Sequence, residues 1–282
     1  MALDTSVKEA YMLGHSLKES ARLHVQHWMW GQRLGWQLHP QIEAPQEGLK
    51  IVDIGAGNAC WLLELARNKP KTWSFCGLDN STANFPARSY LPSNVTLQKC
   101  DVFAPLPIEL HNQFDVVHIR AFCVVVKGGN PHPLTANLLQ LLKPGGWIQW
   151  DEADCASFCA HSPDSQISSA KSAALIDQWQ SFASKTDLHF QWLSDLPGLL
   201  HEHKLEVLDR FRLPISDDLR KPSTDIFVIG LEAMGRLAGE RDGRLIGTSQ
   251  SWEQLFHGLI EEVSSGVTIS MDMVVALGRK QE

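Results

Sequence analysis

Residues 51–62 (IVDIGAGNACWL) constrain the fold of this chain more than any other segment. They have the pattern of a buried strand that passes through a glycine turn directly into a helix. Gly55 and Gly57 lack a Cβ, so the backbone can approach a ligand closely there, and the start of a helix offers unpaired N–H groups. A second strand-like run ends in Asp79, about twenty positions on, where a carboxylate can accept hydrogen bonds from ribose hydroxyls. Together these features predict an adenosine-binding pocket at the carboxyl edge of a parallel sheet.

The turn differs from the dinucleotide fingerprint G-x-G-x-x-G, whose third glycine permits close packing of helix on strand. Cys60 stands at the third glycine position, and Asp53 precedes the turn to give D-x-G-x-G. A carboxylate beside the cofactor would repel a pyrophosphate, but it would attract an ammonium and a sulfonium. The residues therefore favour S-adenosylmethionine (SAM) over NAD, and an NAD-dependent oxidoreductase becomes a distant alternative.

The overall charge argues against a nucleic-acid partner. The 282 residues carry a formal net charge of −7 without any basic run. Residues 1–8 lack the apolar core of a secretory signal, and no apolar run approaches the roughly 20 residues of a membrane span. We therefore expect a cytoplasmic protein without a membrane partner, and the oligomeric state stays open.

Six cysteines are spread along the chain. Cys155 and Cys159 form C-x-x-x-C, but no second Cys/His pair at zinc spacing accompanies them. No metal site is expected from this pattern.

Strand and helix patterns alternate along most of the chain, which predicts the α/β class with a doubly wound, mostly parallel sheet of Rossmann type. The seven expected strands are residues 49–54, 73–78, 95–100, 114–119, 147–150, 205–213 and 267–277, with the last antiparallel at the edge. Helices are expected at 58–68, 130–142, 167–183, 196–203, 224–238 and 252–264.

Two segments are expected to cover the pocket. Residues 1–48 are predicted to form a helical cap ahead of a SAM-binding domain of residues 49–282, and a second cap is expected as an insertion at about 152–196. Within the first cap, Leu17, Ala21, Val25 and Trp28 make an apolar stripe at helical spacing. Glu19, Arg22 and Gln26 fall on another face of that helix.

The order of these motifs resembles that of the class I SAM-dependent methyltransferases, most strongly over residues 50–152. Residues 11–27, with YMLG, ESARL and QH, and residues 142–152 (LKPGGWIQWDE) are similar to fungal secondary-metabolite methyltransferases. That group includes enzymes acting on N, O, S or C centres of natural products, and also a regulator of secondary metabolism with the same fold.

The resemblance implies residues for the methionine end of SAM. Asp53, Gly55 and Gly57 would surround the methionine moiety, with Asn58 at the start of the helix. Arg120, at the end of the fourth strand, would border the same moiety, and a buried guanidinium needs a partner.

It also implies residues for the adenosine end. Asp79 would bind the ribose hydroxyls, and Asn80 would border the adenine. Asp101 would accept from the adenine amino group, while Val102 would donate its backbone N–H. The alternative for Asp101 is that it simply caps a turn.

Two residues of the N-terminal cap would close over the cofactor. Arg22 is the candidate partner for the SAM carboxylate, since a guanidinium can bind it in a bidentate manner. The alternative is a pair with Glu19 on the surface of the same helix. Tyr11 is assigned to the cofactor as well, with a packing role as its alternative.

Methyl transfer from a sulfonium is an in-line displacement, so positioning matters most. A neutral nucleophile also has to lose a proton, for which His27 and Glu152 are the candidate catalytic bases. The alternatives are a packing or cofactor-lining role for His27 and a solvated or hydrogen-bonded loop carboxylate for Glu152. Asp151 and Asp154 also stay open as bases.

The ten tryptophans suggest an aromatic wall for a flat or bulky apolar substrate. Trp28, Phe122 and Trp150 are the residues expected to form it.

Three functions follow. The favoured one is a methyltransferase that tailors a small-molecule natural product with SAM as methyl donor. The alternatives are a SAM-binding regulatory or complex-forming protein, and an enzyme that uses SAM to assist a rearrangement without methylation. The acceptor molecule and its reacting atom are not identified by the sequence.

Overall fold

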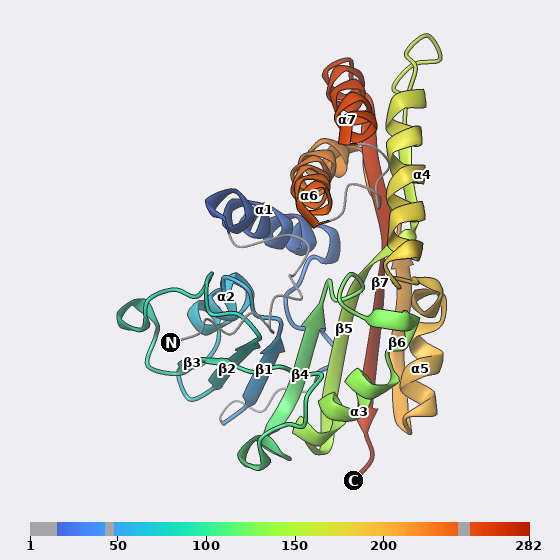
Figure 1. The fold of residues 1–282 in the computed structure, drawn as a ribbon. Coiled ribbons are helices and arrows are strands. Elements are labelled where there is room, and N and C mark those ends of the chain that lie inside the picture. The colour runs from blue at the N-terminus through green and yellow to red at the C-terminus, as the bar shows by residue number, and fades with distance from the viewer. Residues whose placement is uncertain (1–15, 43–47, 242–248) are drawn as a thin grey trace, which may run out of the picture.

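The computed structural model describes residues 16–42, 48–241 and 249–282, and its centre is a single seven-stranded sheet (Figure 1). The strand order is β3-β2-β1-β4-β5-β7-β6. The strands are β1 (Lys50–Ile54), β2 (Ser74–Asp79), β3 (Val95–Lys99), β4 (Phe114–Arg120), β5 (Leu142–His161), β6 (Leu205–Leu213) and β7 (Thr268–Lys280). The first five are mutually parallel, and β7 runs antiparallel between β5 and β6. The predicted fold class is confirmed.

Helices cover both faces of the sheet. They are α1 (Leu17–Leu34), α2 (Cys60–Asn68), α3 (His132–Leu141), α4 (Ala170–Lys185), α5 (Leu196–Glu202), α6 (Arg220–Arg241) and α7 (Ser249–Ser264). Because successive strand residues point to opposite faces, Val52 packs with α3 and α5 while Ile51 packs with α2. None of the helices in the described ranges is both long and apolar enough to cross a membrane.

The sequence predicted that the last strand lies at the edge of the sheet, and this placement is wrong. β7 is buried on both faces along most of its length, and β6 forms the edge beside it. Its nearly continuous run of apolar and small residues, 273–278, fits such a central position.

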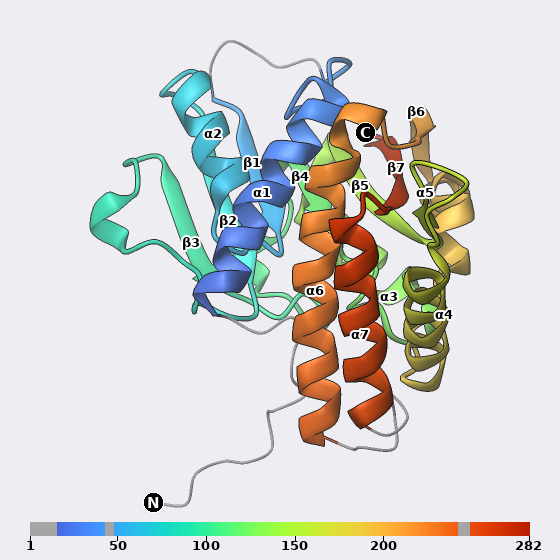
Figure 2. The same cartoon turned by 90° about the horizontal axis from the view of Figure 1, so that it is seen from above.

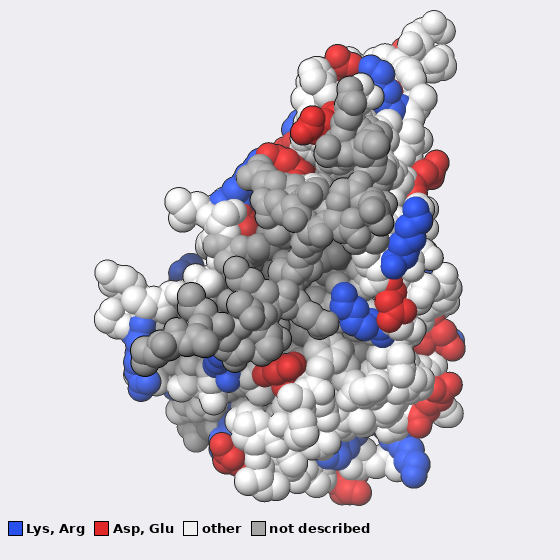
Figure 3. All heavy atoms as spheres, in the orientation of Figure 1, with Lys and Arg blue, Asp and Glu red and all other residues white. Residues whose placement is uncertain are grey.

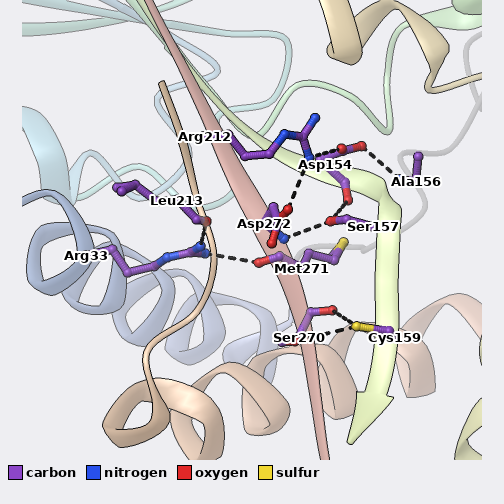
Figure 4. Close-up of polar contacts among 10 residues, drawn as sticks. All are labelled: Arg33, Asp154, Ala156, Ser157, Cys159, Arg212, Leu213, Ser270, Met271 and Asp272. Carbon is purple, nitrogen blue, oxygen red and sulfur yellow. Dashed lines mark hydrogen bonds and ion pairs between the residues drawn. The ribbon is translucent and has the colours of Figure 1, made fainter. Parts of the chain in front are cut away.

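The fifth strand is much longer than predicted. It continues past Trp150 to His161, with a bulge between Asp154 and Cys159 (Figure 4). Arg212 of β6 pairs with Asp154, and the Ser157 hydroxyl accepts from the backbone N–H of Asp272. The polar residues that suggested a loop are therefore satisfied by neighbouring strands, and the insertion expected from about 152 begins as strand.

A layer of helices stands over the carboxyl end of the sheet. Seen from above, α1, α6 and α7 lie side by side, and α4 contacts α7 (Figure 2). Arg33 joins α1 to the sheet by donating to the backbone oxygens of Leu213 (2.5 Å) and Met271 (3.3 Å) (Figure 4). The helices thus enclose the edge at which the sequence placed the pocket.

The apolar stripe of α1 faces outward. Leu17 is 92% exposed, Trp28 48% and Val25 39%. Glu19 and Arg22 are buried instead, next to Met29 and Trp30. Periodicity identified the helix correctly, but the face with polar residues is the one turned toward the protein.

Glu262 stabilises the start of α4 from the neighbouring helix α7. Its carboxylate accepts from the backbone N–H groups of Lys171 (3.0 Å) and Ser172 (2.8 Å) and from the Ser172 hydroxyl. Burial alone would raise the pKa of Glu262, but these hydrogen bonds hold it below its ordinary value. The adjacent Glu261 is exposed and pairs with the Lys171 ammonium.

We expect Glu262→Ala to lower the free energy of unfolding by about 1–3 kcal/mol, because two N–H groups in the first turn of α4 lose their acceptor. Since the folded-state pKa is lowered, the contribution of Glu262 is complete above its ordinary pKa of 4.5 and is lost as pH falls through the folded value. Urea unfolding at pH 7 and pH 4 measures both effects. Glu261→Ala is the matched control, and an equal loss in both variants would contradict this role.

Candidate functional site

A cavity of about 250 Å³ lies where the strand order reverses, at the carboxyl ends of β1, β2 and β4. Such switch points are the usual ligand sites of doubly wound sheets. The inner face of α1 closes the cavity over the sheet, and its far half is built from the distal part of β5, α4, α6 and β7. One continuous space thus joins the cofactor edge to a second compartment.

The glycine turn and Asp79 are held in one hydrogen-bonded unit. Gly55 N–H donates to Leu78 O, and Asp79 accepts from the N–H groups of Gly57 and Ser81, at 2.9 Å each. Gly55 has a φ of +69°, and a Cβ there would lie 2.4 Å from the Phe122 ring. Both facts require glycine at that position.

The cofactor end of the cavity is acidic. Asp53, Asp79 and Asp101 all line it, together with Asn80 and Val102. Because clustered carboxylates repel phosphates, this wall fits a cationic adenosine cofactor and does not fit a dinucleotide. Asp101 also accepts from Phe103 N–H at 2.9 Å, so the turn-capping contact is present beside its place in the cavity wall.

Asn58 lines the cavity. The sequence predicted that α2 starts at Asn58, but the helix starts two residues later. The helix begins at Cys60, and Ala59 occupies the N-cap with a φ of 60°. The Asn58 side-chain oxygen accepts from Cys60 N–H at 3.3 Å, and its amide nitrogen lies 2.9 Å from a ring nitrogen of His24. Asn58 therefore links the glycine turn to α1.

Arg22 lines the cavity, and its guanidinium is already engaged. Nε and Nη2 donate to the two carboxylate oxygens of Glu19, at 2.8 and 2.5 Å, and both side chains are buried. The intrahelical pair considered as an alternative for Arg22 is therefore present. Tyr11 lies outside the described residues.

His118 was not predicted, although it supports the cofactor edge. It is fully buried in the middle of β4, with Nδ1 2.7 Å from Asp53 and Nε2 3.3 Å from Asp151. Burial alone would lower the pKa of His118, but hydrogen bonds to Asp151 and Asp53 raise it above the ordinary value. Its signal in the sequence was an ionisable residue between Val117 and Ile119, in the apolar middle of the strand.

Glu152 does not reach the cavity. It is fully buried and accepts from the backbone N–H groups of Phe122 (2.7 Å) and Cys123 (3.2 Å) and from the Trp150 indole (3.0 Å). Burial raises the pKa of Glu152 to about 7. A general base has to reach the proton that it removes, so this placement contradicts a catalytic role, and the hydrogen-bonded alternative accounts for Glu152.

The other candidate bases are also engaged away from the cavity wall. His27 bonds to Glu64 and Arg120, Asp151 to His118, and Asp154 to Arg212. Arg120 and Phe122 line the cavity. Trp28 is half-exposed on the outer face of α1, and Trp150 is fully buried in the core, so the expectation that they line the substrate wall is wrong.

The second compartment of the cavity is mostly apolar. Its wall was missed from the sequence because it comes from four distant elements: Phe158, Trp179, Ile226, Phe227, Leu231, Met234 and Met271. Trp179 and Phe158 pack edge to face, with ring centroids 5.6 Å apart. Across the described ranges, no group of three or more His, Cys, Asp or Glu side chains is arranged to hold a metal ion.

Comparison with known proteins agrees with this architecture. Residues 29–209 match the model of a methyltransferase domain family, which is more than half of the chain. Methyltransferase grgD of a Penicillium species is 33% identical over 59% of this chain and 60% of its own length. N-methyltransferase tcpN of Claviceps purpurea is 37% identical over 48% of this chain and 49% of its own length. The chain thus spans about half to three fifths of these curated relatives.

A solved structure shares the fold. It is Haemonchus contortus phosphoethanolamine N-methyltransferase 2 in complex with phosphomonomethylethanolamine and S-adenosylhomocysteine. Its TM-score is 0.53 at 15% identity, over 93% of this chain and 58% of the other. The chain belongs to the methyltransferase domain family, and its sheet is that of the class I SAM-dependent methyltransferases, which confirms the resemblance seen in the sequence.

We expect Glu152→Gln to destabilise the fold by about 1–3 kcal/mol, because the amide turns one of two acceptors into a donor facing a buried N–H. The raised pKa also means that the wild-type contribution is greatest below pH 4.5 and falls as pH rises through about 7, since the ionised form is desolvated. Thermal melts between pH 5 and pH 8 measure this. Glu109→Gln, at an exposed site, is the control; a pH-independent difference of zero would refute the assignment.

Proposed function

We propose that this protein transfers a methyl group from SAM to an apolar small-molecule acceptor. The observation that carries the proposal is that one cavity has both an acidic end, at the glycine turn, and an apolar end with aromatic side chains. Family membership supports the reaction type. SAM supplies a methyl group on a sulfonium, so the protein mainly has to align the acceptor with it and exclude water.

The residues of the acidic end divide between the parts of the cofactor. Asp79 holds the ribose, and Asn80, Asp101 and Val102 border the adenine. The methionine end lies along Asp53, Gly55, Gly57 and Asn58. We further propose that α1, within residues 1–48, and α4, within residues 152–196, act as caps of the SAM-binding domain.

The apolar compartment favours an uncharged or weakly polar acceptor. Methionine and aromatic side chains dominate its wall, and these pack against flat or irregular apolar molecules. The resemblance of residues 11–27 and 142–152 to fungal secondary-metabolite methyltransferases favours a natural product. The name N-methyltransferase, carried by the Claviceps purpurea relative, favours a nitrogen acceptor among the N, O, S and C possibilities.

We do not propose a nucleic-acid partner. On the face seen in Figure 3, basic and acidic side chains are interspersed, without a basic patch among the residues described there. The cytoplasmic location expected from the sequence remains part of the proposal.

Calorimetric titration with S-adenosylhomocysteine (SAH) tests the cofactor assignment. Wild type should bind one equivalent, and Asp79→Ala should weaken binding by about 1–3 kcal/mol, roughly 5- to 150-fold in Kd, because ribose hydroxyls and the Gly57 N–H lose an acceptor. Asp218→Ala, at an exposed carboxylate, is the control. Equal affinities in all three proteins would remove Asp79 from the site.

Product mass then separates the candidate functions. Incubation with SAM and a panel of apolar amines, phenols and thiols should give a product heavier than its acceptor by one methylene unit. An isomerised product of unchanged mass would indicate SAM-assisted rearrangement, and SAH binding without any turnover would favour the regulatory alternative.

A further inference from the structure

Three side chains from three different elements meet beside the methionine end of the cavity, and among them Arg120 lines it. His27 comes from α1, Glu64 from α2 and Arg120 from the end of β4. His27 Nε2 lies 2.6 Å from a carboxylate oxygen of Glu64, and His27 Nδ1 lies 3.3 Å from Arg120 Nη2. The set connects the capping helix α1 to the two elements that build the cofactor edge.

The protonation of His27 follows from its two partners. A guanidinium has only donors, so Nδ1 of His27 must accept from Arg120 with its lone pair. The ring proton is then on Nε2, where it donates to the Glu64 carboxylate. This arrangement requires a neutral imidazole whose one accessible lone pair is already used, so it does not suit the role of general base.

The guanidinium of Arg120 is oriented into the cavity and is not neutralised by a nearby side chain. It lies over the Trp30 ring, 5.5 Å from the centroid, and within the described ranges no carboxylate lies at ion-pair distance from it. Arg22 and Arg33 also line the cavity. Arg22 already holds Glu19 in a bidentate pair, and Arg33 donates to the backbone oxygens of Leu213 and Met271. The cavity therefore offers Arg120 as the better placed cation for an incoming anion.

An acidic residue, Asp53, lines the same end of the cavity as Arg120. Ile119 of β4 pairs with Ile54 of β1, so Arg120 follows beside the glycine turn that Asp53 precedes. Asp53, Cys60 and Arg120 all line this end of the cavity. A carboxylate and a guanidinium so placed match the ammonium and the carboxylate of an α-amino acid.

We propose that Arg120 binds the carboxylate at the amino-acid end of the cofactor. In this proposal His27, held by Glu64, is a positioning residue that orients the guanidinium of Arg120 through the contact at Nδ1. The proposal rests on the proposed function. It replaces Arg22 as the carboxylate partner and His27 as the base.

The same geometry makes cofactor binding depend on pH. Glu64, Arg120 and Asp53 are the charged groups that act on His27. Burial and the Arg120 charge lower the pKa of His27 below its ordinary 6.5, while Glu64 and Asp53 oppose this. Protonation would place an N–H at Nδ1 against the guanidinium and release Arg120, so affinity should fall only on the acid side of pH 6.5.

The first experiment compares SAH with its decarboxylated analogue, which keeps the adenosine and the ammonium. Wild type should prefer SAH. Arg120→Leu should raise the Kd of SAH by about 10- to 100-fold and leave the analogue almost unchanged, since only SAH loses a charge-assisted pair. Arg67→Leu, which removes an exposed arginine of α2, is the matched control. If Arg120→Leu is unfolded by circular dichroism, Arg120→Lys replaces it, and a preference for SAH that stays intact in the folded variant overturns the proposal.

The second experiment tests His27 through the same two ligands. His27→Leu should weaken SAH alone, whereas His27→Gln, which can both accept and donate, should restore SAH affinity and remove its loss at acid pH. A purely structural role would weaken both ligands equally and would overturn the positioning role. Absence of SAH binding by wild type would instead contradict the proposed function itself, so the two failures are distinguishable.

Discussion

The cofactor edge depends on how two buried carboxylates, one on β1 and one on β5, are paired inside the sheet. Asp53 of β1 is 5% exposed and Asp151 of β5 is 1% exposed, and β4 runs between them. An unpaired buried carboxylate is costly, and it would take up a proton instead. His118 of β4 contacts both, and Trp61 stacks on its ring at 3.7 Å. One imidazole thus pairs with both carboxylates and holds Asp53 at the cavity wall.

This arrangement explains why the cavity has two contrasting ends. Charge is concentrated where the central strands stop, since β1, β2 and β4 each end in or next to a polar side chain at that edge. Beyond it, β5 and β7 continue as a long antiparallel pair that carries α4, α6 and α7 above the sheet. Extending these two strands adds an apolar compartment without changing the cofactor edge.

The first half of the sheet could be predicted from the sequence because its signals are local. Strands β1, β2 and β4 are short and mostly apolar in the middle, and the glycine turn has its own pattern. The faces of α1 could not be predicted in this way. Leu17 and Val25 share an apolar stripe in the sequence, but the structure exposes that stripe and turns the face with Arg22 toward the cavity. β5 was predicted too short because the partners of its polar residues, Arg212 and Asp272, lie far along the chain.

The site residues that were placed correctly from the sequence are also those that depend on local signals. Residues in the glycine turn and at the ends of β2 and β4 lie at the cavity, because strand ends meet at one edge whatever the details of packing. Trp150 and Glu152 lie within β5, the strand whose end was misplaced, and they are buried in the sheet. Glu152 shows why geometry has to precede titration in assigning a base. The pKa of Glu152, about 7, would suit proton transfer. The burial that raises this pKa also separates the carboxylate from any methyl-accepting substrate. Its oxygens already accept from the backbone N–H groups of Phe122 and Cys123.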